Sequence, residues 1–184
     1  VSAINEAGGT AIGLSGKDAD LIKVRKLRKT KRDPESNIEK ILDLGFVGEP
    51  ESINPDIFVT LEDTDIIPVI APLGVDEKGD TYNINADTAA GAIASALVAE
   101  KLIMITDVSG ILDKEKKLIS QAKISECKKL ISQGIISGGM IPKVETCISS
   151  VNSSVESAHI LNGKIPHVLL LEIFTEHGSG TMIV

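Results

Sequence analysis

The chain has 184 residues, with 19 Lys and Arg against 26 Asp and Glu, so its net charge is −7. This length favours a single domain, and 42% hydrophobic residues suffice for a core, which excludes a disordered tail or a coiled coil. The acidic balance argues against nucleic acid as a partner. No apolar run reaches the roughly 18 residues of a membrane-spanning helix. Two cysteines, Cys127 and Cys147, form no disulfide framework and indicate reduced thiols in the cytoplasm.

Glycine, proline and polar clusters separate the elements expected in the first third of the chain. These are a helix end at residues 1–7, a buried strand Thr10–Leu14, an exposed strand Leu21–Leu27, a polar loop 26–37, a strand Leu44–Gly48 and a helix that Asn54-Pro55 opens and that ends near Glu62. The polar loop carries a basic cluster: Lys26, Arg28, Lys29, Lys31 and Arg32. Because no aromatic residues are interleaved with it, a solvated hairpin or loop is favoured over a nucleic-acid site.

The remaining elements alternate between strands and helices. They are a strand Ile66–Leu73 buried on both faces, a short strand or turn Asp80–Ile84, a helix Asp87–Ala99, a strand Leu102–Val108, helices Ile124–Gln133 and Met140–Val155, a strand beginning at His159–Leu161, a helix Val168–Phe174 and a strand Thr181–Val184. This alternation predicts an α/β fold with a mainly parallel sheet.

Ligands of open α/β sheets bind beyond the carboxyl ends of the strands, so polar residues that follow apolar strands are the candidates. In Tyr82–Asp87, two amides, Asn83 and Asn85, offer donors and acceptors for an amino-acid-like ligand. Asp87 is suited to orienting other groups or holding a metal. The structural alternative for this segment is plain helix capping.

Two further segments suit a nucleotide. Thr106–Gly110 (TDVSG) offers a hydroxyl, a carboxylate and backbone N–H groups to phosphates or ribose, although a tight turn is an equal interpretation. Ser137–Lys143 (SGGMIPK) leads from two glycines into a helix N-terminus, which favours phosphate, and Lys143 adds a positive charge. A surface lysine is the structural alternative.

The sequence lacks the motifs of several other nucleotide-binding, hydrolytic and metal-binding sites. Gly13–Asp18 (GLSGKD) is not a phosphate-binding loop, because Asp18 follows the glycine and lysine where that motif requires Ser or Thr. No dinucleotide fingerprint and no G-x-S-x-G hydrolase motif occurs. The cysteines and the three histidines lack metal-ligand spacing, so no metal site is predicted.

Five segments in order resemble the amino-acid kinase superfamily and, within it, the acetylglutamate kinases. They are GLSGKDADLI, IIPVIAPLGVDEKGDTYNINADTAAGAIA, TDVSGILDK, SGGMIPKVETC and LLLEIFTEHGSGTMIV, and the match covers essentially the whole chain. The resemblance implies a three-layer α/β/α sandwich with a mainly parallel open sheet. Residues 1–184 would be the C-terminal portion of a single kinase domain. It also implies transfer of a phosphoryl group from MgATP to the side-chain carboxylate of N-acetyl-L-glutamate, a step of arginine biosynthesis in the cytoplasm.

The same resemblance implies roles for individual residues. Lys143 would stabilise the transferring phosphoryl group and Asp87 would organise the lysines of the site, while Asn83 and Asn85 would bind the substrate. The ATP site would comprise Asp107, Val108, Ser109, Gly110, Ile111, Leu112, Ile135, Ile136 and Ser137. An arginine feedback site would include Lys17, Glu172 and Gly178. A structural helix–turn–strand ending is the alternative for the last two.

The chain begins at Val1, within what reads as a helix, so we expect an N-terminal truncation. The family's other transition-state lysine would lie upstream, and the chain alone is therefore expected to be inactive. A homo-oligomer is expected from the family. The alternatives are another amino-acid kinase, acting on carbamate, glutamate or aspartate, and a non-catalytic module that binds a nucleotide or arginine.

Overall fold

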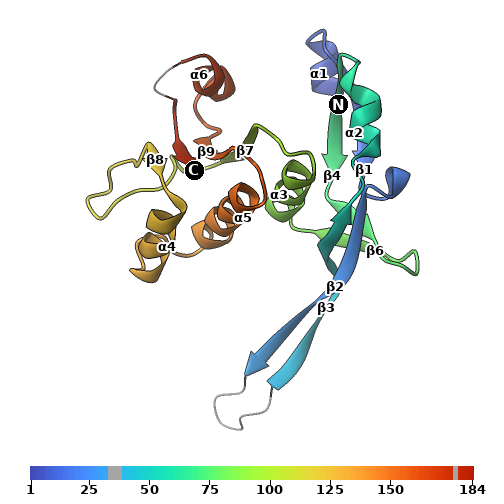
Figure 1. Cartoon of the computed structure of the whole chain (residues 1–184), viewed down its shortest axis with the longest axis horizontal. Helices are drawn as coiled ribbons and strands as arrows, with labels where there is room; N and C mark the ends of the chain where they lie inside the picture. The colour runs from blue at the N-terminus through green and yellow to red at the C-terminus, as the bar shows by residue number, and fades with distance from the viewer. Residues whose placement is uncertain (33–38, 176–177) are drawn as a thin grey trace. The chain divides into compact units, whose positions relative to one another are not determined.

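The structure is a computed structural model that describes residues 1–32, 39–175 and 178–184, with the side chains of residues 29–42 outside the description. The chain forms two compact units, Val1–Ala92 and Ile93–Val184, and the boundary falls within helix α3 (Ala86–Ala96). Figure 1 labels the elements of both units, and each is described by itself.

The first unit contains a parallel pair of strands and a small closed barrel. Strands β1 (Thr10–Ser15) and β4 (Ile66–Ala71) form the pair. The barrel consists of β2 (Ile22–Arg32), β3 (Glu39–Ile53), β6 (Thr81–Ile84) and β5 (Leu73–Val75), in that order around the ring. The helices are α1 (Ser2–Glu6), the short 3-10 turn η1 (Asp18–Asp20) and α2 (Asp56–Glu62). Alternate residues of the barrel strands are buried, among them Ile22, Val24, Tyr82 and Ile84.

Five predictions in this unit were wrong. The strand expected at Leu21–Leu27 is not exposed, because Leu21, Ile22 and Val24 are buried. The apolar run from Ile66 to Leu73 is two strands that belong to different sheets, because the chain breaks at Pro72, which has no N–H for a ladder. The prediction that this segment is buried on both faces was also wrong, since Ile67 of β4 is 48% exposed. Strand β1 is also mostly exposed. Lys26–Arg32 is strand rather than loop, because it pairs with β3 as a hairpin; residues 33–37 of the predicted loop lie outside the description.

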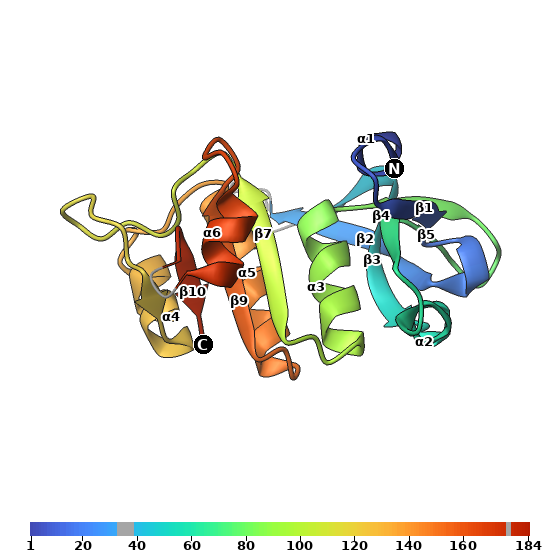
Figure 2. The ribbon, with the colours of Figure 1, turned by 90° about the horizontal axis from the view of Figure 1, so that it is seen from above.

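The second unit is built on a four-stranded sheet. Strand β7 (Lys101–Thr106) runs parallel to β9 (Ser157–Asn162), and β10 (Thr181–Ile183) runs antiparallel to β9 and parallel to β8 (Gln121–Ala122). Helices α4 (Ile124–Ser132), α5 (Met140–Asn152) and α6 (Val168–Phe174) complete the unit. Figure 2 shows α5 running alongside β9.

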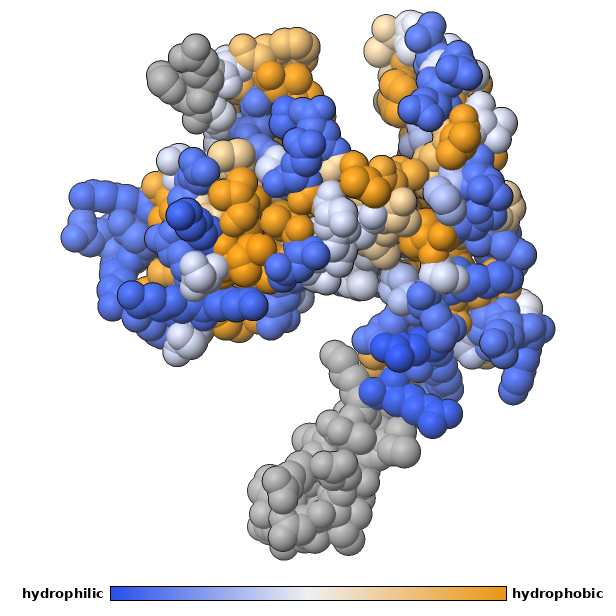
Figure 3. Space-filling view, in the orientation of Figure 1, coloured by the Kyte–Doolittle hydropathy of each residue, from blue (hydrophilic) through white to orange (hydrophobic). Residues whose placement is uncertain are grey.

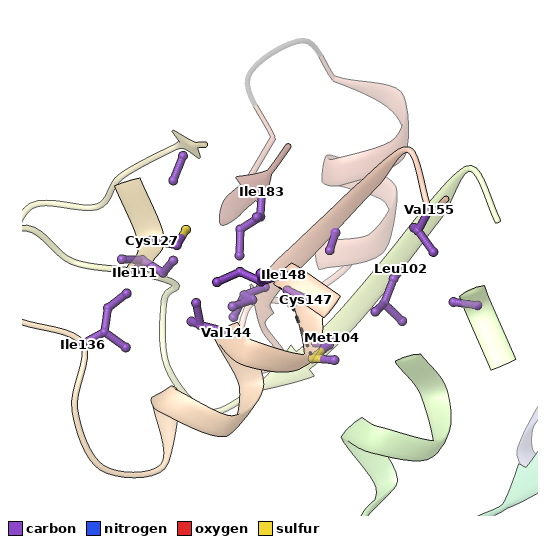
Figure 4. Close-up of a cluster of buried hydrophobic side chains, with 14 residues drawn as sticks. Leu102, Met104, Ile111, Cys127, Ile136, Val144, Cys147, Ile148, Val155 and Ile183 are labelled. Carbon is purple, nitrogen blue, oxygen red and sulfur yellow. Dashed lines mark hydrogen bonds between the residues drawn. The ribbon is translucent and has the colours of Figure 1, made fainter. Parts of the chain in front are cut away.

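The core of this unit lies between the sheet and the two helices α4 and α5. In Figure 4, Val144, Cys147 and Ile148 of α5 face Leu102 and Met104 of β7. The Cys147 Sγ and Met104 Sδ atoms are 3.8 Å apart. Both cysteines are buried thiols outside any disulfide, and burial raises the pKa of the Cys127 thiol to about 11. These cysteines therefore act as small apolar core residues.

Helix α6 covers the opposite face of the sheet. Successive strand residues point to opposite faces, and Ala158 and Ile160 of β9 belong to the core under α5. His159 consequently points the other way, where its Nδ1 contacts Glu172 of α6. The second unit is thus a helix–sheet–helix sandwich, as predicted for the α/β fold. Strand β8 was not predicted, because two residues are too short for a hydrophobic pattern.

Candidate functional site

The predicted nucleotide segments follow the carboxyl end of β7. Leu102 and Met104 anchor this strand in the core, and the Thr106 carbonyl at its end accepts a hydrogen bond from the Gly163 N–H just beyond β9. The carboxyl ends of these two parallel strands therefore meet at one edge of the sheet. Asp107 and Ser109, which come next, are exposed. Their polar groups are available at the edge where α/β folds bind ligands.

A buried threonine holds the turn that follows. The Thr181 hydroxyl, which is fully buried at the start of β10, accepts a 2.8 Å hydrogen bond from the Ile111 N–H and donates a 2.7 Å bond to the Ile119 carbonyl. Gly110 fits here because its φ is +132° and because a Cβ atom would come within 2.6 Å of the Thr181 hydroxyl. The backbone of TDVSG bends after β7, and the Asp107 and Ser109 side chains are exposed.

Beyond the turn, residues 111–119 form a hydrophilic loop. Asp113 Oδ1 accepts hydrogen bonds from the N–H groups of Glu115 (2.8 Å) and Lys117 (2.9 Å), and Leu112 and Leu118 form a β-bridge. The loop is the hydrophilic projection at the left edge of Figures 1 and 3. Of the predicted ATP residues in this region, Gly110 and Ile111 are buried and structural, and Leu112 is exposed.

The N-terminus of α5 lies at the same edge of the sheet. Helix α5 packs on β9 and its last residue leads back, after a few residues, to the start of that strand, so the two run in opposite directions. The beginning of α5 is therefore level with the carboxyl ends of β7 and β9. Lys143 is half-buried in the first turn of this helix, and Ser137 is exposed ahead of it. Ile136 is buried in the core and anchors the segment.

The predicted acetylglutamate residues belong to the first unit. Asn83 is exposed on β6, between the buried Tyr82 and Ile84. Asn85 Oδ1 accepts bonds from the Thr88 N–H (3.2 Å) and hydroxyl (3.4 Å), so the capping interpretation is confirmed for this residue. Asp87 is half-buried in the first turn of α3.

A cavity of about 350 Å³ lies between α6 and the sheet of the second unit. It is lined by His159, Glu172, Gly178 and Gly180, among others. The Glu172 carboxylate is held on both sides, by His159 Nδ1 at 2.6 Å and by the Ser179 N–H at 2.8 Å, and Ser157 Oγ lies 2.9 Å from the other His159 nitrogen. Of the predicted arginine residues, Glu172 and Gly178 are thus brought together, whereas Lys17 is an exposed residue of the first unit.

Sequence reasoning missed three residues that shape these sites. Thr181 and Ser157 are ordinary strand residues, and His159 was considered only as a metal ligand. Their importance comes from contacts across the fold, such as the 70-residue separation between Ile111 and Thr181, for which no local pattern exists.

The part of the chain that the structure describes contains no group of three or more His, Cys, Asp or Glu suited to a metal ion. No helix within the same residues is long and apolar enough to cross a membrane.

Comparisons with known proteins place this geometry in a family. The acetylglutamate kinases of Rhodospirillum centenum and Parvibaculum lavamentivorans are 57% and 58% identical over 183 residues, covering 100% of this chain and 60% of each relative. The chain thus spans about 60% of the length of these curated relatives. The N-acetylglutamate synthase of Neisseria gonorrhoeae, complexed with coenzyme A and N-acetyl-glutamate, shares the fold over 100% of this chain and 39% of its own, with a TM-score of 0.83 at 23% identity. A sequence model described as "Amino acid kinase family" matches residues 1–162, and the chain therefore belongs to the amino acid kinase family.

Proposed function

We propose that this chain supplies the nucleotide half of an acetylglutamate kinase, together with part of its acceptor site. The whole protein would convert MgATP and N-acetyl-L-glutamate into ADP and N-acetyl-L-glutamyl 5-phosphate, in the arginine pathway of the cytoplasm. Residues 1–184 would be one portion of a single kinase domain. The similarity to acetylglutamate kinases over the whole chain supports this acceptor over carbamate, glutamate or aspartate.

The observation that carries the proposal is the meeting of three elements at one edge of the second unit. The 107–112 turn, the Gly138-Gly139 segment and the first turn of α5 all lie at the carboxyl ends of β7 and β9. Backbone N–H groups at a turn and at a helix N-terminus favour phosphate oxygens. Magnesium would enter as part of the MgATP co-substrate.

Charge neutralisation is the chemistry that these residues would supply. The acceptor carboxylate is already a nucleophile, so phosphoryl transfer needs positioning and positive charge rather than a strong base. Lys143 would stabilise the transferring phosphoryl group. Asp87 would organise the cationic groups, and Asn83 would donate to the acetylglutamate. A cation that acts on the developing charge contributes roughly 10²–10³ in rate, by analogy with oxyanion donors.

The test has a binding part and a turnover part. The 184-residue chain is titrated with MgADP by calorimetry, and the whole protein is assayed for acyl phosphate by trapping with hydroxylamine. N-acetyl-L-glutamate should be the acceptor, with carbamate, L-glutamate and L-aspartate inert. Lys143→Ala should lower kcat by roughly 10²–10³ while KM for ATP changes little, and Lys143→Arg should recover part of the rate. Failure of a cooperatively folded chain to bind MgADP would contradict the proposal.

A second candidate function, feedback control by arginine, is favoured by the cavity beneath α6. The buried Glu172 carboxylate is already oriented by His159 and by the Ser179 N–H, and its remaining lone pairs suit a guanidinium. Calorimetric titration with L-arginine should give binding that Glu172→Gln abolishes, with L-citrulline, the uncharged analogue, as the matched control ligand. Equal binding of the two ligands would refute the role of the carboxylate.

Oligomeric state also belongs to this proposal. The whole protein is expected to be a homo-oligomer, which light scattering at several concentrations measures directly.

A further inference from the structure

Asn162 and Gly163 form the one place in the sequence where an asparagine precedes a glycine. They lie where β9 ends, at the edge of the second unit that also carries the 107–112 turn and the start of α5. Because glycine has no Cβ atom, its backbone nitrogen can approach the amide carbon of the asparagine before it. That attack forms a cyclic imide, which water opens to aspartate or isoaspartate. The dipeptide is therefore a candidate for chemical modification.

The turn after β9 activates the Asn162 side-chain amide. Its Oδ1 accepts a 3.0 Å hydrogen bond from the Lys164 N–H, while the Asn162 backbone carbonyl accepts a 3.1 Å bond from the Ile165 N–H. A backbone donor at a carbonyl oxygen stabilises the negative charge that this oxygen gains when a nucleophile adds to the carbon. The Lys164 N–H thus favours attack at Asn162 Cγ. Since Asn162 is half-buried and Gly163 is exposed, water can reach the dipeptide.

A hydrogen bond to β7 restrains the nucleophile. The Gly163 N–H donates to the Thr106 carbonyl at 2.8 Å, and a nitrogen whose proton is held in this way is a poor nucleophile. The bond closes the β7–β9 ladder, whose last residue pair is Thr106 with Asn162. The ends of such ladders open at a lower free energy than the core. The Ile105 side chain packs at the same point, since a Cβ atom on Gly163 would lie 2.5 Å from its Cγ2.

We propose that Asn162 is a site of spontaneous deamidation and that opening of the β7–β9 end controls its rate. In the open state the Gly163 nitrogen gives its proton to water or hydroxide and bonds to Asn162 Cγ. The side-chain nitrogen takes up a proton from solvent and leaves as ammonia. Water then adds to the imide and opens it, so the net reaction converts an amide and water into a carboxylic acid and ammonia. The product carries a new carboxylate at the edge proposed for the phosphates.

The test follows the conversion of Asn162 in the 184-residue chain by peptide mass spectrometry in mildly alkaline buffer. Ile105→Ala removes the side chain that packs at Gly163 and should speed conversion about 10-fold, because opening then exposes less apolar surface. Ile67→Ala is the matched control, since Ile67 is 48% exposed on a strand of the first unit and Ile105 is 49% exposed. The control should leave the rate unchanged, and unfolding in urea should raise it beyond that of Ile105→Ala.

Three results would overturn the inference. An Asn162 that stays intact in the folded chain while the urea-unfolded chain converts would show that the folded protein has no such site. Equal rates in the folded and unfolded chains would show that the bond to Thr106 restrains nothing. Equal rates in Ile105→Ala and Ile67→Ala would show that opening of the β7–β9 end is not the controlling step.

The effect of the new charge rests on the proposed function and is measured separately. Asn162→Asp carries the charge of the product from the start and should bind MgADP about 5-fold more weakly than the wild-type chain, because a carboxylate repels phosphates. Asn162→Gln keeps an uncharged amide and is the control. Equal affinity of Asn162→Asp and Asn162→Gln would overturn the effect on the phosphates. Absence of MgADP binding by a cooperatively folded wild-type chain would contradict the proposed function, whereas the deamidation itself is decided by the mass spectra.

Discussion

The hydroxyl of Thr181 ties the turn after β7 to the sheet, and replacing Thr181 with Val tests how much this tie contributes. The substitution keeps the shape of the side chain but removes the acceptor of the Ile111 N–H and the donor to the Ile119 carbonyl. A buried donor left without a partner costs about 1–3 kcal/mol. Ile111 is 1% exposed, so its N–H should incur this cost in full, whereas the half-buried Ile119 adds about 1 kcal/mol.

The variant should therefore lose about 2–4 kcal/mol of unfolding free energy, measured by urea denaturation followed by circular dichroism. Thr146→Val is the matched control, because its hydroxyl bonds only to the Pro142 carbonyl within α5 in an exposed position. The control should lose less than about 1 kcal/mol. MgADP affinity should also fall in Thr181→Val, since the turn that would contact the phosphates is no longer fixed. A loss no larger than that of the control would refute the reasoning.

Two further predictions concern single residues in the two units. Gly110→Ala should destabilise the second unit by more than about 2 kcal/mol in urea denaturation, because alanine strains a φ of +132° and its Cβ would meet the Thr181 hydroxyl; no change in the midpoint would disprove this. In the first unit, burial by itself would raise the pKa of Asp76, but the N–H groups of Asp80 and Lys78 outweigh it and lower that pKa below its usual 3.8. The stabilisation is therefore present above pH 3.8 and lost as pH falls through the lower folded value. The difference in urea midpoint between wild type and Asp76→Asn should be complete at neutral pH and shrink in acid, whereas a constant difference would contradict this sign.

The sequence predicted the second unit better than the first, and local pattern explains the difference. Helix α6 was predicted with its observed bounds, because Val168–Phe174 is an apolar segment, interrupted only at Glu172, between turns. Ile66–Leu73 looked equally continuous, yet it divides at Pro72 between two sheets. An apolar run records that side chains are hydrophobic, and it carries no information about which neighbouring strand will accept each backbone hydrogen bond.

The same difference between local and long-range contacts applies to the candidate sites. Asn85 was correctly given a capping alternative, because capping depends on residues only three apart in the chain. His159 and Glu172 were not paired in advance, since their contact requires that β9 and α6 lie on each other with the odd-numbered strand residues facing the helix. That orientation is set by Ala158 and Ile160 entering the core on the other face. Contacts of this kind become predictable only once the sheet face is known.

Strand β10 connects the two sites proposed for the second unit. Its residues alternate between the faces of the sheet, so Gly180 and Met182 line the cavity with Glu172 while Thr181 points toward the turn after β7. A ligand that contacts this cavity and shifts β10 must also shift the Thr181 hydroxyl that holds the Ile111 N–H. Any arginine effect on nucleotide affinity would thus have a short route through this hydrogen bond, provided that arginine binds the two arrangements of β10 with different affinity. Thr181→Val removes that hydrogen bond and leaves the Glu172 carboxylate in place, so it should reduce the coupling between the two ligands while arginine itself still binds.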